Sequence, residues 1–140
     1  MRILENFFSL VHLEESFIEP LVLGITYENR ELLYERINKR VDKMLEAGLL
    51  GEVEKLIAMG LRNTPTASAA IGYKEFYPYF DGTSTLEECV EKLKTESRRY
   101  AKRQQTWFRR NEKICWIDLD NKESTQIFEE AERLCDEFLM

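Results

Sequence analysis

The sequence predicts a mostly α-helical chain with two short strands of the kind that is buried within a sheet. Two almost wholly apolar runs, PLVLGIT at 20–26 and ICWIDLD at 114–120, are typical of strands covered on both faces. The residues between them follow helical periodicity, so the strands cannot form a hairpin and would pair only across a long excursion. With 140 residues and 44% hydrophobic content, we expect one unit, residues 1–140, around one core.

The helical region, predicted at 29–110, opens with two helices that end at glycines. The first is predicted at 29–47 with Gly48 as its stop, and the second at about 50–59, closed by Gly60. The apolar stripe of the first helix consists of Leu33, Tyr34, Ile37, Val41, Met44 and Leu45.

A loop at 62–68 separates these helices from a third, which is predicted to start near Ala67 and to approach its end at Pro78. Ser84 with Glu87 three residues later has the pattern of a capping box, so a long helix is predicted from there to Phe108.

An amphipathic helix is predicted at 123–139, after the second strand. The side chains expected to point inward are Ile127, Phe128, Ala131, Leu134, Cys135 and Phe138. A sheet of only two buried-type strands has edges and apolar faces that need covering. We therefore expect either further strands in a longer α/β protein or a second copy of the chain to complete the sheet.

Composition excludes several classes of function. A net charge of -6 and a pI near 5.0 argue against binding nucleic acid or membrane by bulk charge. No apolar run is long enough for a membrane helix and the start lacks a signal-peptide pattern, so we expect a cytoplasmic protein without membrane contact. Three distant cysteines, Cys89, Cys115 and Cys135, are expected to be buried thiols, and His12 has no second histidine with which to form a metal site.

One stretch, RRYAKRQQTWFRR at 98–110, gathers positive charge within this acidic chain. From Lys92 to Arg110 lie 8 of the 20 basic residues, and on a helical wheel they flank an apolar face that contains Tyr100 and Trp107. Gln104 falls inside that face, so it is either a buried polar anchor or a group presented to a ligand. Spacing alone leaves RNA binding and a solvated structural face equally open.

A second motif, AIGYKEF at 70–76, places a glycine within a predicted helix. Gly72 there costs about 1 kcal/mol relative to alanine, which indicates the close approach of a packed helix or, less simply, of a ligand. Tyr73 and Lys74 could stack on a base and contact a phosphate, but such pairs are common in proteins.

Three motifs in register, RINKRVDKMLEAGLLGEVEKL, AIGYKEF and YAKRQQTWFRR followed by WIDLD, resemble the C-terminal part of the tRNA dimethylallyltransferases, also called tRNA isopentenyltransferases. The resemblance covers about 24–118, and MRILENFF is similar to the segment just upstream in that family. It implies a P-loop-kinase-like α/β core with a helical insertion, of which this chain is the C-terminal portion. It also implies transfer of a dimethylallyl group from dimethylallyl diphosphate to N6 of the adenine adjacent to the tRNA anticodon.

The resemblance assigns site residues by position. Arg40 corresponds to the second arginine of the family's R-I-x-x-R and is expected to contact the diphosphate; an ordinary ion pair on the helix flank is the alternative. The residues expected to contact tRNA are Ala69, Ala70, Ile71, Gly72, Tyr73, Lys74, Lys102, Arg103, Gln104, Gln105, Thr106, Trp107, Phe108 and Arg109.

The sequence also departs from the family. It has no glycine-rich phosphate loop and no counterpart of the general-base aspartate, and Ser97 stands where a threonine is usual. Mg²⁺ is expected in the complete enzyme but not on this chain alone, which we expect to be inactive without an N-terminal half. The alternatives are a stand-alone RNA-binding module and a helical structural remnant that self-associates.

Overall fold

A computed structural model describes residues 19–140, so the predictions for His12 and MRILENFF lie outside the described residues. The elements, in chain order, are β1 (Val22–Thr26), α2 (Arg30–Glu46), α3 (Leu49–Ala58), η1 (Leu61–Asn63), η2 (Ala67–Ala69), η3 (Lys74–Phe76), α4 (Tyr77–Phe80), α5 (Leu86–Phe108), β2 (Ile114–Asp118) and α6 (Ser124–Leu139). The predicted mixture of helices with two short strands is confirmed.

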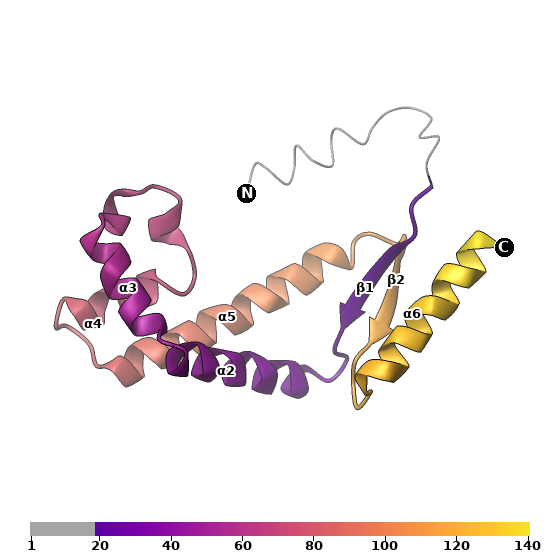
Figure 1. The fold of residues 1–140 in the computed structure, drawn as a ribbon, viewed down its shortest axis with the longest axis horizontal. Coiled ribbons are helices and arrows are strands. Elements are labelled where there is room, and N and C mark those ends of the chain that lie inside the picture. The colour runs from indigo at the N-terminus through magenta and orange to yellow at the C-terminus, as the bar shows by residue number, and fades with distance from the viewer. Residues whose placement is uncertain (1–18) are drawn as a thin grey trace.

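The two strands pair in parallel, from Val22 opposite Ile114 to Thr26 opposite Asp118. Between them α2 runs away from the strands and α5 returns to them (Figure 1). The carboxylate of Asp120 accepts a hydrogen bond from the Asn29 amide at 2.7 Å, which ties the end of β2 to the start of α2. The long excursion that the sequence predicted therefore closes on itself beside the strand pair.

The main core lies in the helical lobe, which comprises α2, α3, η3, α4 and the first half of α5. Its buried members are Val41, Leu49, Val53, Phe76, Cys89 and Leu93. Each comes from an apolar position of an amphipathic helix or from the η3 turn. Burying these side chains provides most of the lobe's stabilisation, since each fully buried aliphatic or aromatic side chain contributes roughly 1.5–3 kcal/mol.

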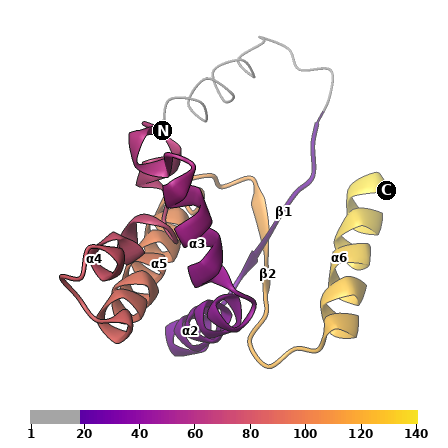
Figure 2. The same ribbon diagram turned by 60° about the vertical axis from the view of Figure 1, so that its left-hand side comes forward.

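The strand pair and α6 form a thinner second part of the molecule. In Figure 2 the strands stand between the helical lobe and α6. The side chain of Ile117 on β2 is buried, but Ile25 on β1 is 67% exposed. The two strands have the composition of buried strands, yet their faces are partly open within the described residues. This agrees with the prediction that a sheet of only two such strands has apolar faces that need covering.

Gly24 in β1 is fixed by its cross-strand neighbours. A Cβ atom built there would lie 2.6 Å from Cγ2 of Ile114 and 2.8 Å from the ring of Trp116. The absence of a side chain at position 24 allows these two residues of β2 to pack across the backbone of β1.

The predicted third helix from Ala67 to Pro78 is wrong. The segment consists of two short 3₁₀ turns, η2 and η3, joined through Gly72, and only α4 is α-helical. Gly72 has φ of +112°, a conformation that no α-helix contains. Its role is therefore conformational, and a Cβ at this position would meet no atom within 4 Å, so tight helix packing does not explain it.

Two further predictions require correction at helix ends and faces. The capping box at the start of α5 is formed by Thr85 and Glu88 rather than by Ser84 and Glu87. The inward face predicted for α6 is only partly covered: Ile127, Ala131 and Leu134 are half-buried, while Phe128, Cys135 and Phe138 are exposed. Among the described residues α6 packs chiefly against β2, and one strand of a two-stranded sheet covers only part of this face.

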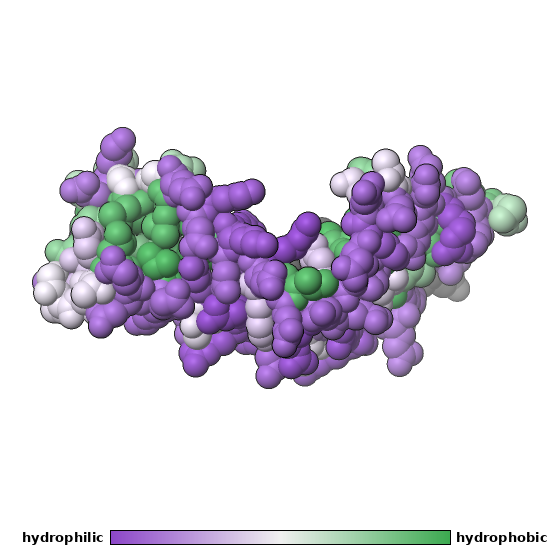
Figure 3. Space-filling view, turned by 90° about the horizontal axis from the view of Figure 1, so that it is seen from below, coloured by the Kyte–Doolittle hydropathy of each residue, from purple (hydrophilic) through white to green (hydrophobic). Residues whose placement is uncertain are grey.

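The surface of the molecule carries uncovered apolar groups. Figure 3 shows an apolar area on the helical lobe and a smaller one near the middle of a mostly hydrophilic face. The three cysteines differ in burial: Cys89 is buried, Cys115 is half-buried and Cys135 is exposed, so the prediction of three buried thiols holds for Cys89 alone.

None of the helices in residues 19–140 is long and apolar enough to span a membrane.

Candidate RNA-binding and diphosphate site

The long helix α5 contributes residues to both hollows of the candidate site. Its first half is held in the lobe by the buried side chains of Cys89 and Leu93. Along its second half the same apolar face is open, with Tyr100 48% and Trp107 43% exposed. The predicted helix to Phe108 is confirmed, and its apolar face is covered in the first half of the helix but not at Tyr100 and Trp107.

A hollow of about 840 Å³ lies between α2, the η2–η3 segment and α5. Arg40 enters it from α2, Gly72 from the turn and Gln104 from α5. The structure therefore brings together three residues that are far apart in sequence, one expected to contact diphosphate and two expected to contact tRNA. The other lining residues are Leu33, Ile37, Val41, Met44, Ala69, Ile71, Lys74, Leu93, Ser97, Tyr100, Ala101 and Arg103.

The hollow has two chemical characters. Leu33, Ile37 and Met44 on α2 give it an apolar wall, whereas Arg40 and Arg103 contribute guanidinium groups. A cavity that combines apolar walls with a few charged groups suits a ligand with an apolar part and an anionic part. The family resemblance assigned Arg40 and Arg103 to ligand contacts, whereas periodicity placed Leu33, Ile37 and Met44 on the apolar stripe of their helix without assigning them to a site.

Gln104 is exposed, so the expectation that this amide could be a buried polar anchor is wrong. The position lies within the apolar face on the wheel, but that face is uncovered at this level of α5. The remaining alternative, an amide presented to a ligand, agrees with its place in the hollow's lining.

The segment at 69–74 is held by two carboxylates behind it. The buried Glu75 accepts a hydrogen bond from the Gly72 amide at 2.8 Å, and Tyr73 donates its hydroxyl to Glu52 on α3 at 2.8 Å. The bond to Glu52 raises the pKa of Tyr73 above its ordinary value, because it stabilises the protonated phenol. Neither carboxylate was identified from the sequence, since an isolated glutamate gives no periodic signal.

Three basic residues of the 92–110 stretch are engaged within the protein. Lys94 bridges to Asp42 at 2.8 Å, which raises the pKa of the Lys94 ammonium. Arg98 donates to Asn38 at 2.7 Å and to Thr95, and Arg99 pairs with Glu96. The structural interpretation of the charge run is thus correct for these positions.

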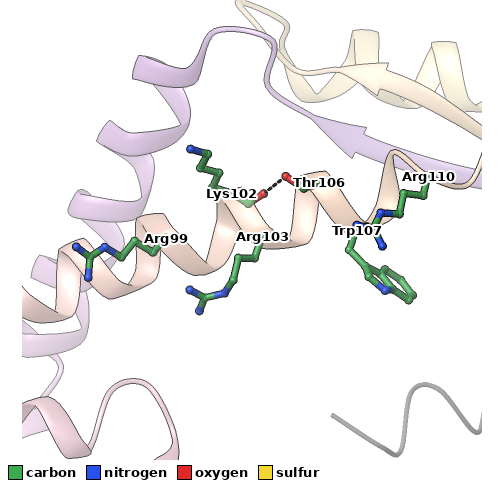
Figure 4. Close-up of a pocket in the computed structure, with 6 residues that line it drawn as sticks. All are labelled: Arg99, Lys102, Arg103, Thr106, Trp107 and Arg110. Atoms are coloured by element: carbon green, nitrogen blue, oxygen red, sulfur yellow. Dashed lines mark hydrogen bonds between the residues drawn. The ribbon is translucent and has the colours of Figure 1, made fainter.

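A second hollow of about 450 Å³ lies along the exposed side of α5. It is lined by Arg99, Lys102, Arg103, Thr106, Trp107 and Arg110. Figure 4 shows Arg103 and Trp107 projecting to the same side of the helix, with Lys102 directed to the other. Within residues 19–140, neither Lys102, Arg103 nor Arg110 forms an ion pair. Their charge is therefore available to an anionic partner.

The other assigned residues lie near these hollows or serve the helix itself. Gln105 donates to the hydroxyl of Thr26 at 3.3 Å and so ties α5 to β1. Thr106 donates to the Lys102 carbonyl, and Phe108 packs edge-to-face on Trp107 with 4.8 Å between ring centroids. Ala70 and Tyr73 belong to the segment but do not line the hollow, and the exposed Arg109 caps the end of α5.

Arg40 is exposed, and it has no ion-pair partner in the described part of the chain. The alternative of an ordinary ion pair on the helix flank therefore has no support there. Within the same residues, no group of histidine, cysteine, aspartate and glutamate could hold a metal ion.

Comparison with known proteins agrees with this arrangement. The family model described as IPP transferase matches residues 5–111. The tRNA dimethylallyltransferase of Acetivibrio thermocellus is 50% identical over 121 residues, which are 83% of this chain and 38% of that protein. Its counterpart in Ligilactobacillus salivarius is 52% identical over 103 residues, or 74% of this chain and 33% of that protein.

Solved structures show the same relationship. A tRNA isopentenylpyrophosphate transferase from Bacillus halodurans superposes with a TM-score of 0.77 at 42% identity, covering 96% of this chain and 44% of that one. A tRNA isopentenylpyrophosphate transferase from Staphylococcus epidermidis gives 0.79 at 37% identity, covering 95% of this chain and 42% of that one. The chain spans about a third of the length of the curated relatives described above. With a family model matched over most of its length and the fold of these transferases, the chain belongs to the IPP transferase family.

Proposed function

We propose that this chain forms the tRNA-facing helical part of an enzyme that transfers dimethylallyl from dimethylallyl diphosphate to N6 of the adenine adjacent to the tRNA anticodon. The observation that carries the proposal is the convergence of Arg40, Gly72 and Gln104 on one hollow. Its volume of about 840 Å³ lies within the range of roughly 300–1,000 Å³ that is usual for small-molecule sites.

Each wall of the hollow has a role in this proposal. The apolar residues of α2 would receive the dimethylallyl group, and the Arg40 guanidinium would stabilise the charge that develops on the departing diphosphate. The turn at 69–74 and Gln104 would face the extruded adenine, because a base must leave its stack before its amino group can react.

The second hollow extends the surface available to RNA. Lys102, Arg103 and Arg110 would contact backbone phosphates while the exposed rings of Tyr100 and Trp107 offer stacking surfaces. Arg103 lies 5.8 Å from the ring centre of Tyr100, so a base or phosphate here would meet a cation and an aromatic group together.

We expect binding without catalysis from the 140 residues alone. The sequence contains no glycine-rich phosphate loop, and diphosphate transfer needs backbone amides, a lysine and Mg²⁺ to hold the leaving group. An N-terminal half would supply these groups and would also pair with the open strands. Such an enzyme acts in the cytoplasm, where its tRNA substrate is.

A stand-alone RNA-binding module is the second candidate, favoured by Lys102, Arg103 and Arg110 of α5, which form no ion pair within residues 19–140. A structural remnant that self-associates through its open strand faces is the third. Sedimentation separates these two, because a monomer that binds RNA agrees with the former and a dimer without RNA affinity with the latter.

The proposal is tested with a labelled anticodon stem-loop that carries an adenine beside the anticodon. We expect salt-sensitive binding by the purified chain and no prenyl transfer from dimethylallyl diphosphate until an N-terminal half is added. Failure to bind the stem-loop at low salt would refute the tRNA-facing role. Steady turnover by the chain alone would refute the dependence on further segments.

A further inference from the structure

Glu75 is the most enclosed charged residue among those described, with 1% of its surface exposed. One carboxylate oxygen, Oε2, accepts the hydrogen bond from the Gly72 amide at 2.8 Å. The other, Oε1, is buried and has no hydrogen-bond partner among the described residues. The side chain is therefore a half-satisfied carboxylate beside the core residue Phe76.

A buried carboxylate with a single hydrogen bond contributes little to the stability of the helical lobe. Enclosing a carboxylate removes its hydration, and apolar side chains of similar volume at such positions often leave a protein as stable or more stable. A reason for glutamate at this position must therefore come from what its single hydrogen bond does. That bond fixes the amide of Gly72.

At Gly72 itself, the bond to Glu75 is the one hydrogen bond to its amide among the described residues. The residue adopts φ of +112°, and the space on the side where a Cβ would point is open to 4 Å. Glycine has the widest conformational freedom of any residue, so an unanchored turn at this point would sample many geometries. The buried bond to Glu75 selects one of them.

The selected geometry matters because the segment faces the larger hollow. Ala69, Ile71, Gly72 and Lys74 all line that hollow, whereas Glu75 does not. The carboxylate holds the segment from the core side and leaves its other side to the ligand. Tyr73, bonded to Glu52 on α3, gives the same segment a second anchor.

We propose that Glu75 is a positioning residue for RNA recognition: through the Gly72 amide it holds residues 69–74 in the one conformation that receives the RNA. The inference rests on the proposed function, because it takes RNA to be the ligand of this segment. It adds a residue that touches no ligand and acts only through its neighbour.

The test compares Glu75→Leu, which removes the acceptor, with Glu75→Gln, whose side-chain carbonyl can still accept from the Gly72 amide. Glu88→Leu is the matched control, because Glu88 accepts a hydrogen bond from the Thr85 amide, also three residues earlier, at the far end of α5. The measurements on the 140-residue chain are affinity for the anticodon stem-loop, thermal unfolding, and exchange of the Gly72 amide hydrogen by NMR.

We expect Glu75→Leu to bind the stem-loop about tenfold more weakly, because only about a tenth of the molecules would then have the 69–74 segment in the conformation that binds RNA. Its unfolding midpoint should stay at or above that of the wild type, and the Gly72 amide should exchange faster. Glu75→Gln should restore affinity to within about threefold, and Glu88→Leu should leave affinity and Gly72 exchange unchanged.

The outcomes separate the inference from the proposed function. If the wild-type chain binds RNA and Glu75→Leu binds equally well, the positioning role is overturned while the proposed function stands. Unchanged Gly72 exchange in Glu75→Leu also overturns it, whatever the affinity. If the wild-type chain itself does not bind, the proposed function fails, and a role for Glu75 in RNA recognition fails with it.

Discussion

Replacing Lys102 and Arg103 together by glutamine gives the sharpest test of the α5 surface. Both side chains line the second hollow, and neither has an ion-pair partner within residues 19–140. Arg99 on the same helix would be a weaker choice, because Glu96 already lies 2.7 Å from it.

The expected magnitude follows from counterion release. Each phosphate contact changes the slope of log affinity against log salt by about 0.7 for a single strand and 0.9 for a duplex. Losing two contacts should therefore lower the slope by about 1.4–1.8. Over a tenfold rise in salt, the affinity of both chains should fall, and the factor by which it falls should be about 25 to 60 times smaller for the variant than for the wild-type chain.

The assay is fluorescence anisotropy of a labelled anticodon stem-loop at several salt concentrations. Lys122→Gln combined with Arg133→Gln is the control, because it changes the net charge equally. Both of these cations are already paired, with Glu130 and Glu137 respectively. An equal change of slope in the two double variants would show that only net charge matters and would refute a phosphate site on α5.

Three further predictions concern the larger hollow and the segment beside it. Gly72→Ala should destabilise the chain by about 1–3 kcal/mol in thermal unfolding, through backbone strain rather than a clash. Arg40→Ala should change the free energy of unfolding by less than about 0.5 kcal/mol, since its guanidinium has no ion-pair partner in the described part of the chain; a larger loss would support a structural role. Tyr73, whose pKa is raised by Glu52, contributes stability below its unfolded pKa of about 10 that is lost as pH rises through its folded pKa. Denaturant titrations should thus show stability falling above about pH 10 in the wild type and falling less in Tyr73→Phe.

Periodicity predicted the long elements well and the turn poorly. The helices α2, α3, α5 and α6 repeat an apolar stripe over several turns, and Gly48 and Gly60 end the first two. The 67–78 segment also contains apolar residues at helical spacing, which is why a helix was predicted there. Its actual bonds run to the side chains of Glu75 and Glu52, and no repeat in the sequence announces such pairings.

The site was predictable only in part. Helical wheels placed the cations of α5 beside its apolar face, and in the structure Arg99, Lys102, Arg103 and Arg110 line a hollow along that helix. The family resemblance assigned Arg40 to diphosphate contact and Gly72 and Gln104 to tRNA contact, and the structure places all three in the lining of the larger hollow. Spacing could not predict this, since it relates residues within one helix but not between helices. The apolar α2 wall was missed because core and cavity residues have the same composition.

The positive charge of α5 stands out against the negative net charge of the whole chain. Residues 98–110 contain six basic residues and no acidic one, within a chain of net charge -6. The rest of the chain contains 14 basic and 26 acidic residues, so an RNA would on average be repelled by other surfaces and attracted by α5, and both effects favour one orientation. Such a distribution contributes to specificity as well as affinity, because it disfavours the non-specific contacts that a uniformly basic protein would make. The acidic composition that excluded binding by bulk charge is therefore compatible with RNA binding, provided that the RNA docks on the part of α5 where Lys102, Arg103 and Arg110 form no ion pair within residues 19–140.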